Sequence, residues 1–171
     1  MNKYIVLLIV LAIGVGYFMS KNTFKGQTDI KTPPTIEQQL GLPNGWTKVE
    51  TSDTDLKLEK KVEASLQPQI VFKQIVSDEA TSPAKYTNTI IAGARSAIPS
   101  LKITDDKRSS TDTLYTALIT GSYLNRGQKV NILQRVYIKS NNVFVMTASY
   151  NGDLSDEINK IFDSLVKEKS L

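Results

Sequence analysis

The sequence contains no cysteine and no histidine. Without cysteine the chain can have no disulfide, no thiol nucleophile, no thiolate-bound metal and no lipid attached at a lipobox cysteine. Without histidine it lacks the side chain that most often transfers protons near neutral pH, so a Ser-His-Asp triad and a histidine-bound zinc site are excluded. The enzyme chemistry that stays open is that of a hydrolase using carboxylates or Ser and Lys.

The chain also has little excess charge outside its first part. The formal net charge is +4, but Lys3, Lys21, Lys25 and Lys31 all lie in the N-terminal segment, against one acid, Asp29. Without them, the totals of 21 basic and 17 acidic residues fall to 17 and 16. A nucleic-acid-binding protein usually carries a basic face that displaces counterions from phosphates. The nearly neutral remainder predicts that no nucleic acid is a partner.

A hydrophobic run stands at the N-terminus. Tyr4–Met19 contains 16 uncharged, mostly apolar residues. As a helix this run would be about 24 Å long, slightly short of the ~20 residues that usually cross a bilayer. A cleaved secretion signal is the alternative, because Gly14-Val15-Gly16 offers a small-x-small cleavage site. The bulky Tyr17, Phe18 and Met19 lengthen the run beyond that site and favour an uncleaved anchor.

We therefore expect three parts: a membrane anchor or signal segment at 1–21, a polar linker at 22–35, and a folded domain at 36–171. Lys21, Lys25 and Lys31 follow the run, so the distribution of positive charge does not favour an outside C-terminus. The expected location is nevertheless the cell membrane, crossed once, with the domain on the extracytoplasmic side. Part of that expectation comes from the family resemblance described below.

Alternation and turn residues predict a domain rich in antiparallel strands. Leu56, Leu58 and Val62 alternate with charged residues, which is typical of a strand with one face in water. Turn residues at Arg126-Gly127 and Ser140–Asn142 would make the last three strands a meander. The expected strands begin at Trp46 and continue as Leu56–Val62, Pro68–Val76, a short strand near Leu101–Thr104, Thr113–Tyr123, Lys129–Lys139 and Val143–Tyr150.

Two helices are expected to cover the sheet. Ser82 and Pro83 suit the N-cap and first position of one helix, which Pro99 ends, and a second helix starts near Ser155. The meander is apolar on both faces, so each face needs cover. The apolar stripes are Tyr86, Ile90, Ala94 and Ala97 in the first helix and Ile158, Ile161, Phe162 and Leu165 in the second. The expected fold class is α+β: an N-terminal transmembrane helix, then a three-layer α/β/α sandwich with a central antiparallel sheet.

This order of elements resembles the PsbP-like family, which includes the extrinsic photosystem II protein and bacterial DcrB-type periplasmic proteins. The resemblance covers about Leu42–Lys169 and rests on "GLPNGW", "NNVFVMTASY" and "INKIFDSL". It implies an extracytoplasmic, non-enzymatic binding or assembly module. We expect this module to be membrane-anchored, to have a protein partner or a small ligand, and to have no cofactor. DcrB-type proteins are typically lipid-anchored, whereas this chain would use Tyr4–Met19.

Two short motifs match S-x-x-K, the start of the serine β-lactamase signature: Ser82–Lys85 and Ser164–Lys167. The S-D-N and K-T-G elements of that signature are missing. A helix cap explains the first match, and the second lies on the C-terminal helix.

The acidic residues have equally simple explanations. The pairs Asp53/Asp55 and Asp105/Asp106 offer oxygen ligands to a hard cation, but a dedicated site usually recruits several carboxylates in one loop. Solvated turns are the simpler interpretation, and we expect no metal. Near Ser155, the residues Asp153, Asp156 and Glu157 would interact with the positive end of the last helix.

Aromatic and basic residues give the last candidates. Arg126, Lys129 and Arg135 form a candidate partner surface, a basic edge for a protein or for lipid head groups, although a solvated hairpin explains them too. The aromatic residues could line a pocket, but in a sheet such residues usually pack in the core. They are Trp46, Tyr115, Tyr123, Tyr137 and Tyr150.

Overall fold

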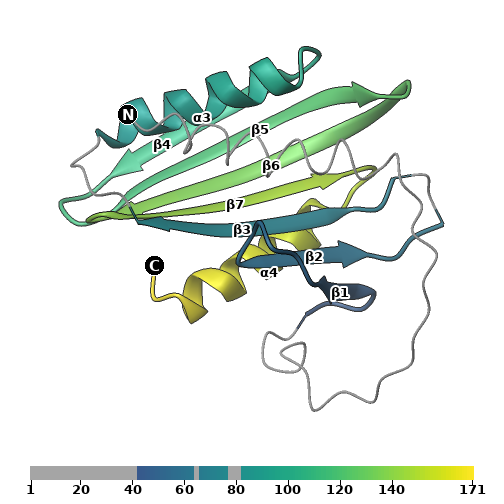
Figure 1. Ribbon diagram of the computed structural model, residues 1–171, viewed down its shortest axis with the longest axis horizontal. Helices are drawn as coiled ribbons and strands as arrows, with labels where there is room; N and C mark the ends of the chain where they lie inside the picture. Colours follow the sequence, from purple (N-terminus) through teal and green to yellow (C-terminus); the bar gives the residue numbers. More distant parts are fainter. Residues whose placement is uncertain (1–41, 64–65, 77–81) are drawn as a thin grey trace.

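The computed structural model describes residues 42–63, 66–76 and 82–171, in which seven strands and two helices form an α+β fold (Figure 1). All neighbouring strands are antiparallel, and the sheet order is β1-β2-β3-β7-β6-β5-β4. The elements are β1 (Trp46–Val49), β2 (Leu56–Lys60), β3 (Gln69–Val76), α3 (Pro83–Ala97), β4 (Lys102–Ser110), β5 (Tyr115–Asn125), β6 (Gln128–Lys139), β7 (Asn142–Tyr150) and α4 (Ser155–Glu168).

The predicted meander of β5, β6 and β7 is confirmed, because both tight turns lie where the turn residues stand. Arg126 and Gly127 have φ values of 51° and 79°, and Ser140 has a φ of 53°. Positive φ in two-residue turns gives the backbone twist that antiparallel strands need. The turns set the register, from Tyr115 opposite Ile138 to Lys139 opposite Asn142.

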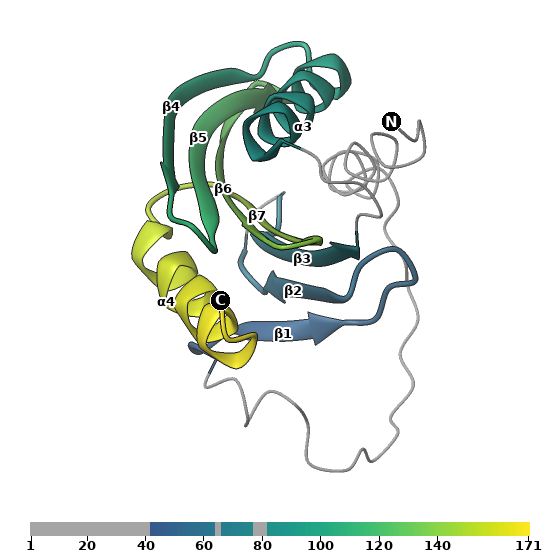
Figure 2. The same ribbon diagram turned by 90° about the vertical axis from the view of Figure 1, so that its left-hand side faces the viewer.

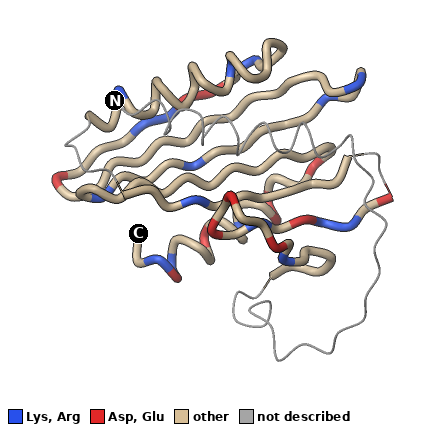
Figure 3. The backbone as a smooth tube through the Cα atoms, in the orientation of Figure 1, with Lys and Arg blue, Asp and Glu red and all other residues tan. Residues whose placement is uncertain are grey.

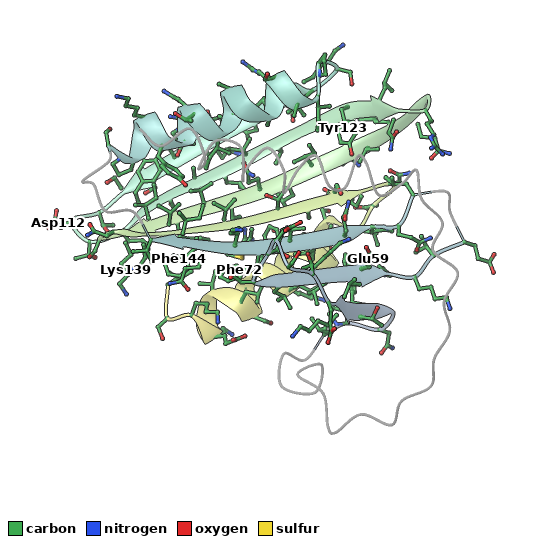
Figure 4. The ribbon with its side chains drawn as sticks, in the orientation of Figure 1. Glu59, Phe72, Asp112, Tyr123, Lys139 and Phe144 are labelled. Atoms are coloured by element: carbon green, nitrogen blue, oxygen red, sulfur yellow. The ribbon has the colours of Figure 1, made fainter. Side chains whose placement is uncertain are left out.

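Helix α4 packs on one face of the sheet. Its Ile158, Ile161, Phe162 and Leu165 are buried, which confirms the predicted stripe. They contact a core cluster that includes Phe72 and Phe144, whose rings stack at 6.4 Å between centroids and point toward α4 in Figure 4.

Helix α3 packs on the other face. Tyr86 and Ile90 share a core cluster with Tyr115, Val143 and others, whereas the α4 cluster takes Phe144 and Met146 from the same strand. Because side chains alternate along a strand, the two helices lie on opposite sides of the sheet, as Figure 2 shows. The predicted three-layer arrangement of helix, sheet and helix is confirmed.

Three sequence-based details were wrong. The fourth strand extends through Ser110, because a strand at the sheet edge needs no buried face to pair with β5. Strand β2 ends at Lys60 and does not reach Val62, because the Val62 backbone N–H and carbonyl are hydrogen-bonded to the Gln67 side chain, at 2.8 and 2.9 Å. Lys57, expected in water, is 5% exposed and ion-paired with Glu59 at 2.7 Å.

A fourth detail concerns the start of α3. Ser82 occupies the N-cap position and Pro83 follows it, but the Ser82 side chain makes no capping hydrogen bond.

Neither helix in the part of the chain that is described has the length and hydrophobicity to cross a bilayer. The predicted anchor, Tyr4–Met19, and the linker at 22–35 lie outside the described residues.

Candidate functional site

Strand β4 forms one edge of the sheet. It is nine residues long and pairs with β5 on one side, and within the described residues no strand pairs with its other side. Between Ile103 and Asp105 the register shifts by one residue, so Thr104 bulges from the ladder, and its hydroxyl lies 3.0 Å from that of Thr120. An unpaired edge strand presents backbone N–H and C=O groups that can pair with another chain.

A groove of about 480 Å³ separates this edge strand from α3. Its helix side consists of one stripe, because residues three or four apart share a helix face. Its strand side is formed by residues of β4 between Ile103 and Arg108. The lining residues are Asn88, Ile91, Ala92, Arg95, Ile103, Thr104, Asp105, Asp106 and Arg108.

One end of the groove is closed by a charged bridge. The Arg108 guanidinium donates to both Asp106 carboxylate oxygens, at 2.8 and 2.6 Å, and to Asn88 Oδ1 of α3 at 2.8 Å. A two-pronged pair of this kind fixes the plane of the guanidinium. Arg108 therefore joins β4 to the helix.

The carboxylates of β4 are held in their charged form. The Arg108 hydrogen bond lowers the pKa of Asp106, and the hydrogen bond from Lys107 lowers the pKa of Asp105. A general acid at neutral pH needs a raised carboxyl pKa. Neither carboxyl of this pair therefore has the raised pKa that a general acid needs.

At the other end of the groove, Arg95 is exposed in the last turn of α3. Within the described residues it makes no hydrogen bond or ion pair. A cation there stabilises the helix end, and it is also available to an anionic group in the groove. The apolar side chains of Ile91 and Ile103 lie among the lining residues. The groove therefore offers an apolar strip, the Arg95 cation and a strand edge with which no other strand of the described residues pairs.

The structure separates the three residues of the predicted partner surface. Arg126 and Lys129 lie at the β5–β6 hairpin, whereas Arg135 lies further along β6 against α4. Arg135 donates to Asp163 at 2.6 Å and to Asn159 at 2.7 Å, and its guanidinium lies 5.5 Å from the centre of the Phe162 ring. It therefore joins β6 to α4, and a surface that includes all three residues stays a prediction.

The candidate serines and acidic turn residues have ordinary structural surroundings. Within the described residues no hydrogen bond joins Ser82 to Lys85, and the Ser164 hydroxyl donates to the Lys160 carbonyl at 3.0 Å, so neither serine is paired with a base. Asp55 accepts from the Gln74 backbone N–H. No group of three or more metal-ligating side chains is present in the described ranges.

The aromatic and helix-start candidates are structural. Trp46, Tyr115, Tyr123 and Tyr150 are buried, and Tyr137 packs partly buried against the α4 cluster. Asp153 accepts a hydrogen bond from Ser155. The Glu157 carboxylate binds two partners in other elements, accepting from Lys60 Nζ and from Trp46 Nε1 at 3.1 Å.

The groove residues Asn88, Arg95 and Arg108 were missed in the sequence. Past Thr104 the sequence has no apolar alternation that would extend the strand, so it carried no signal for these residues. Once β4 is long, the α3 stripe from Asn88 to Arg95 lies beside the strand.

No protein-family description matches the sequence, and no curated protein is similar to it. Solved structures are similar in fold. CyanoP, the cyanobacterial PsbP of Synechocystis, has a TM-score of 0.51 at 14% identity, over 73% of this chain and 81% of its own. LpqN of Mycobacterium tuberculosis, which is involved in cell envelope biogenesis, has a TM-score of 0.50 at 17% identity, over 72% of this chain and 76% of its own.

A third similar structure is the protein of unknown function PA94 from Pseudomonas aeruginosa. Its TM-score is 0.50 at 15% identity, over 71% of this chain and 94% of its own. At such identities the similarity shows the fold. The resemblance to PsbP-like proteins is thus confirmed as a resemblance of structure.

Proposed function

We propose that this protein is a membrane-anchored, extracytoplasmic and non-enzymatic binding or assembly module, and that an extended segment of a protein partner binds in the groove between α3 and β4. The observation that carries the proposal is the groove of about 480 Å³ along the outer edge of β4, with which no strand in the described part of the chain pairs. Among the proteins of this fold, LpqN is involved in cell envelope biogenesis, which supports an envelope location.

The groove suits a strand better than a compact small molecule. A segment added to β4 would gain main-chain hydrogen bonds along the free edge, and its alternate side chains would face the helix. An apolar side chain would meet Ile91 and Ile103, and a carboxylate would meet Arg95. Because the edge also carries Asp105, Asp106 and Lys107, unselected strands are discouraged from pairing. We therefore expect a partner segment with one anionic group placed opposite Arg95.

The test is site-specific photo-crosslinking of the full-length protein in its native membrane. A photoreactive residue at Ala92, inside the groove, should capture one partner, and Arg95→Glu should remove that adduct. The same residue at Lys160, exposed on α4, serves as the control site. A peptide copied from the captured segment should then slow amide hydrogen exchange in β4. Equal capture from both sites, or a bound peptide that leaves β4 exchange unchanged, would contradict the proposal.

A further inference from the structure

The β5–β6 hairpin carries a large hydrophobic side chain in water. Leu124 is 60% exposed, and among the described residues Val76 is the one other large hydrophobic side chain in this condition. The hairpin forms a projecting corner of the molecule, at the upper right of Figure 1. Its position differs from that of the α3–β4 groove.

The exposure of Leu124 does not come from a loose strand end. The Ser100 hydroxyl lies 3.3 Å from the backbone nitrogen of Leu124 and 3.5 Å from its carbonyl oxygen. On the opposite face of the hairpin, Tyr123 and Val130 are buried in a cluster with Ile98 of the α3 end; Figure 4 labels Tyr123 at this corner. The fold therefore holds Leu124 outward at a fixed place.

Three basic residues neighbour this leucine in the sheet and in the turn. Lys129 is its register partner on β6, so the two side chains share one face of the sheet. Lys102 pairs with Ser122, two residues from Leu124 and hence on the same face. Arg126 lies in the turn itself. Figure 3 shows basic residues at the hairpin tip and no acidic residue there.

The whole meander lacks carboxylates. Between Asp112 and Asp153 the sequence contains no aspartate or glutamate, although it contains Arg126, Lys129, Arg135 and Lys139. Arg135 is paired with Asp163, and Lys139 donates to the Ser170 carbonyl at the other end of the sheet. The positive charge at the hairpin tip therefore has no compensating acid on the meander itself.

We propose that the hairpin tip rests on an anionic lipid surface, with Leu124 entering the head-group region and Lys102, Arg126 and Lys129 facing the phosphates. An apolar residue with a basic rim is the pattern by which proteins bind membrane interfaces, and basic residues near an anionic surface add to that binding. The contact would fix how the domain stands on the membrane, and thereby the direction in which the α3–β4 groove faces.

The absence of cysteine makes a direct test simple. In the full-length protein, Leu124→Cys gives one labelling site for a polarity-sensitive fluorophore, and Asn141→Cys places the same label in the β6–β7 turn at the opposite end of the sheet. Both proteins are reconstituted into vesicles of phosphatidylcholine alone or of equimolar phosphatidylcholine and phosphatidylglycerol. The Leu124→Cys label should shift to the blue only with phosphatidylglycerol, and a lipid-borne quencher should reduce its emission. The label at position 141 should show neither effect.

Charge substitutions complete the test. Lys102→Gln and Lys129→Gln, each in the Leu124→Cys background, should each lower the ratio of lipid-bound to free hairpin tips by roughly fivefold. Added salt should also lower this ratio. Equal emission in both lipid mixtures, or an equal shift at both labelled positions, would overturn the proposal. Neither outcome concerns partner binding in the groove, because Arg95 and Ala92 are unchanged in every variant.

Discussion

At the scale of single residues, Glu157 shows a role that the sequence did not suggest. Its place in the first turn predicts a favourable interaction with the positive end of α4. In the structure its carboxylate also accepts hydrogen bonds from Lys60 and Trp46, and so it joins α4 to β1 and β2. The Lys60 hydrogen bond, supported by that of Trp46, lowers the pKa of Glu157 below its usual value of 4.5. Only the folded state has these partners, so protonation of Glu157 favours unfolding.

Glu157→Gln should therefore change how stability depends on pH. Because the folded pKa is depressed, the stabilisation is complete above the unfolded pKa of about 4.5 and is lost as pH falls through the folded pKa. The variant should be less stable than the natural protein near pH 7, and the difference should shrink below that unfolded pKa. Denaturant melts followed by the fluorescence of the single tryptophan, Trp46, measure this. Asp156→Asn, which removes an exposed neighbouring charge, is the control; a difference independent of pH would contradict the assignment.

At the scale of elements, the contact between β4 and β5 depends on Gly121. A Cβ atom at this position would lie 2.7 Å from the Lys102 carbonyl oxygen. That atom belongs to the backbone of β4, so a side-chain rotation cannot relieve the clash.

Gly121→Ala should therefore destabilise the domain by roughly 1–3 kcal/mol, the usual range for an overpacked site. Faster amide exchange should be concentrated at the start of β4. Ser122→Ala adds no atom and should change stability by less than about 0.5 kcal/mol. Equal melts for the two variants, or unchanged exchange in β4, would show that the strand tolerates displacement.

The elements differ in how well the sequence predicts them. The stripe of Ile158, Ile161 and Phe162 predicts α4 because one face of that helix is fully buried. Strand β4 is exposed along most of its length, so its residues from Asp106 to Ser110 show no apolar alternation. Its length is set by pairing with β5, a contact between residues distant in sequence. The α3–β4 groove depends on that pairing. The sequence therefore predicted neither the full length of β4 nor the candidate site beside it.

At the scale of the whole molecule, the three layers could be predicted because apolar residues on both faces of the meander require two covering helices. The positions of the basic side chains relative to one another could not be predicted. Arg126, Lys129 and Arg135 are close in sequence, but six residues along a strand separate side chains by roughly 20 Å. Only the three-dimensional arrangement assigns Arg135 to α4 and leaves the hairpin tip with its exposed leucine.

The last prediction concerns the segment Tyr4–Met19, which we expect to remain in the mature protein as a membrane anchor. Burial of apolar side chains is worth about 25 cal/mol per Å², so such a run should resist extraction by salt or carbonate. The intact mass of protein from native membranes tests retention: a mature chain beginning at Tyr17 in the soluble fraction would identify a cleaved signal. Protease added outside the cell, before and after disruption of the outer layers and then of the membrane, tests the side. Cleavage only after the membrane itself is broken would place the domain in the cytoplasm, and then neither the groove nor the hairpin tip could meet an extracytoplasmic partner or leaflet.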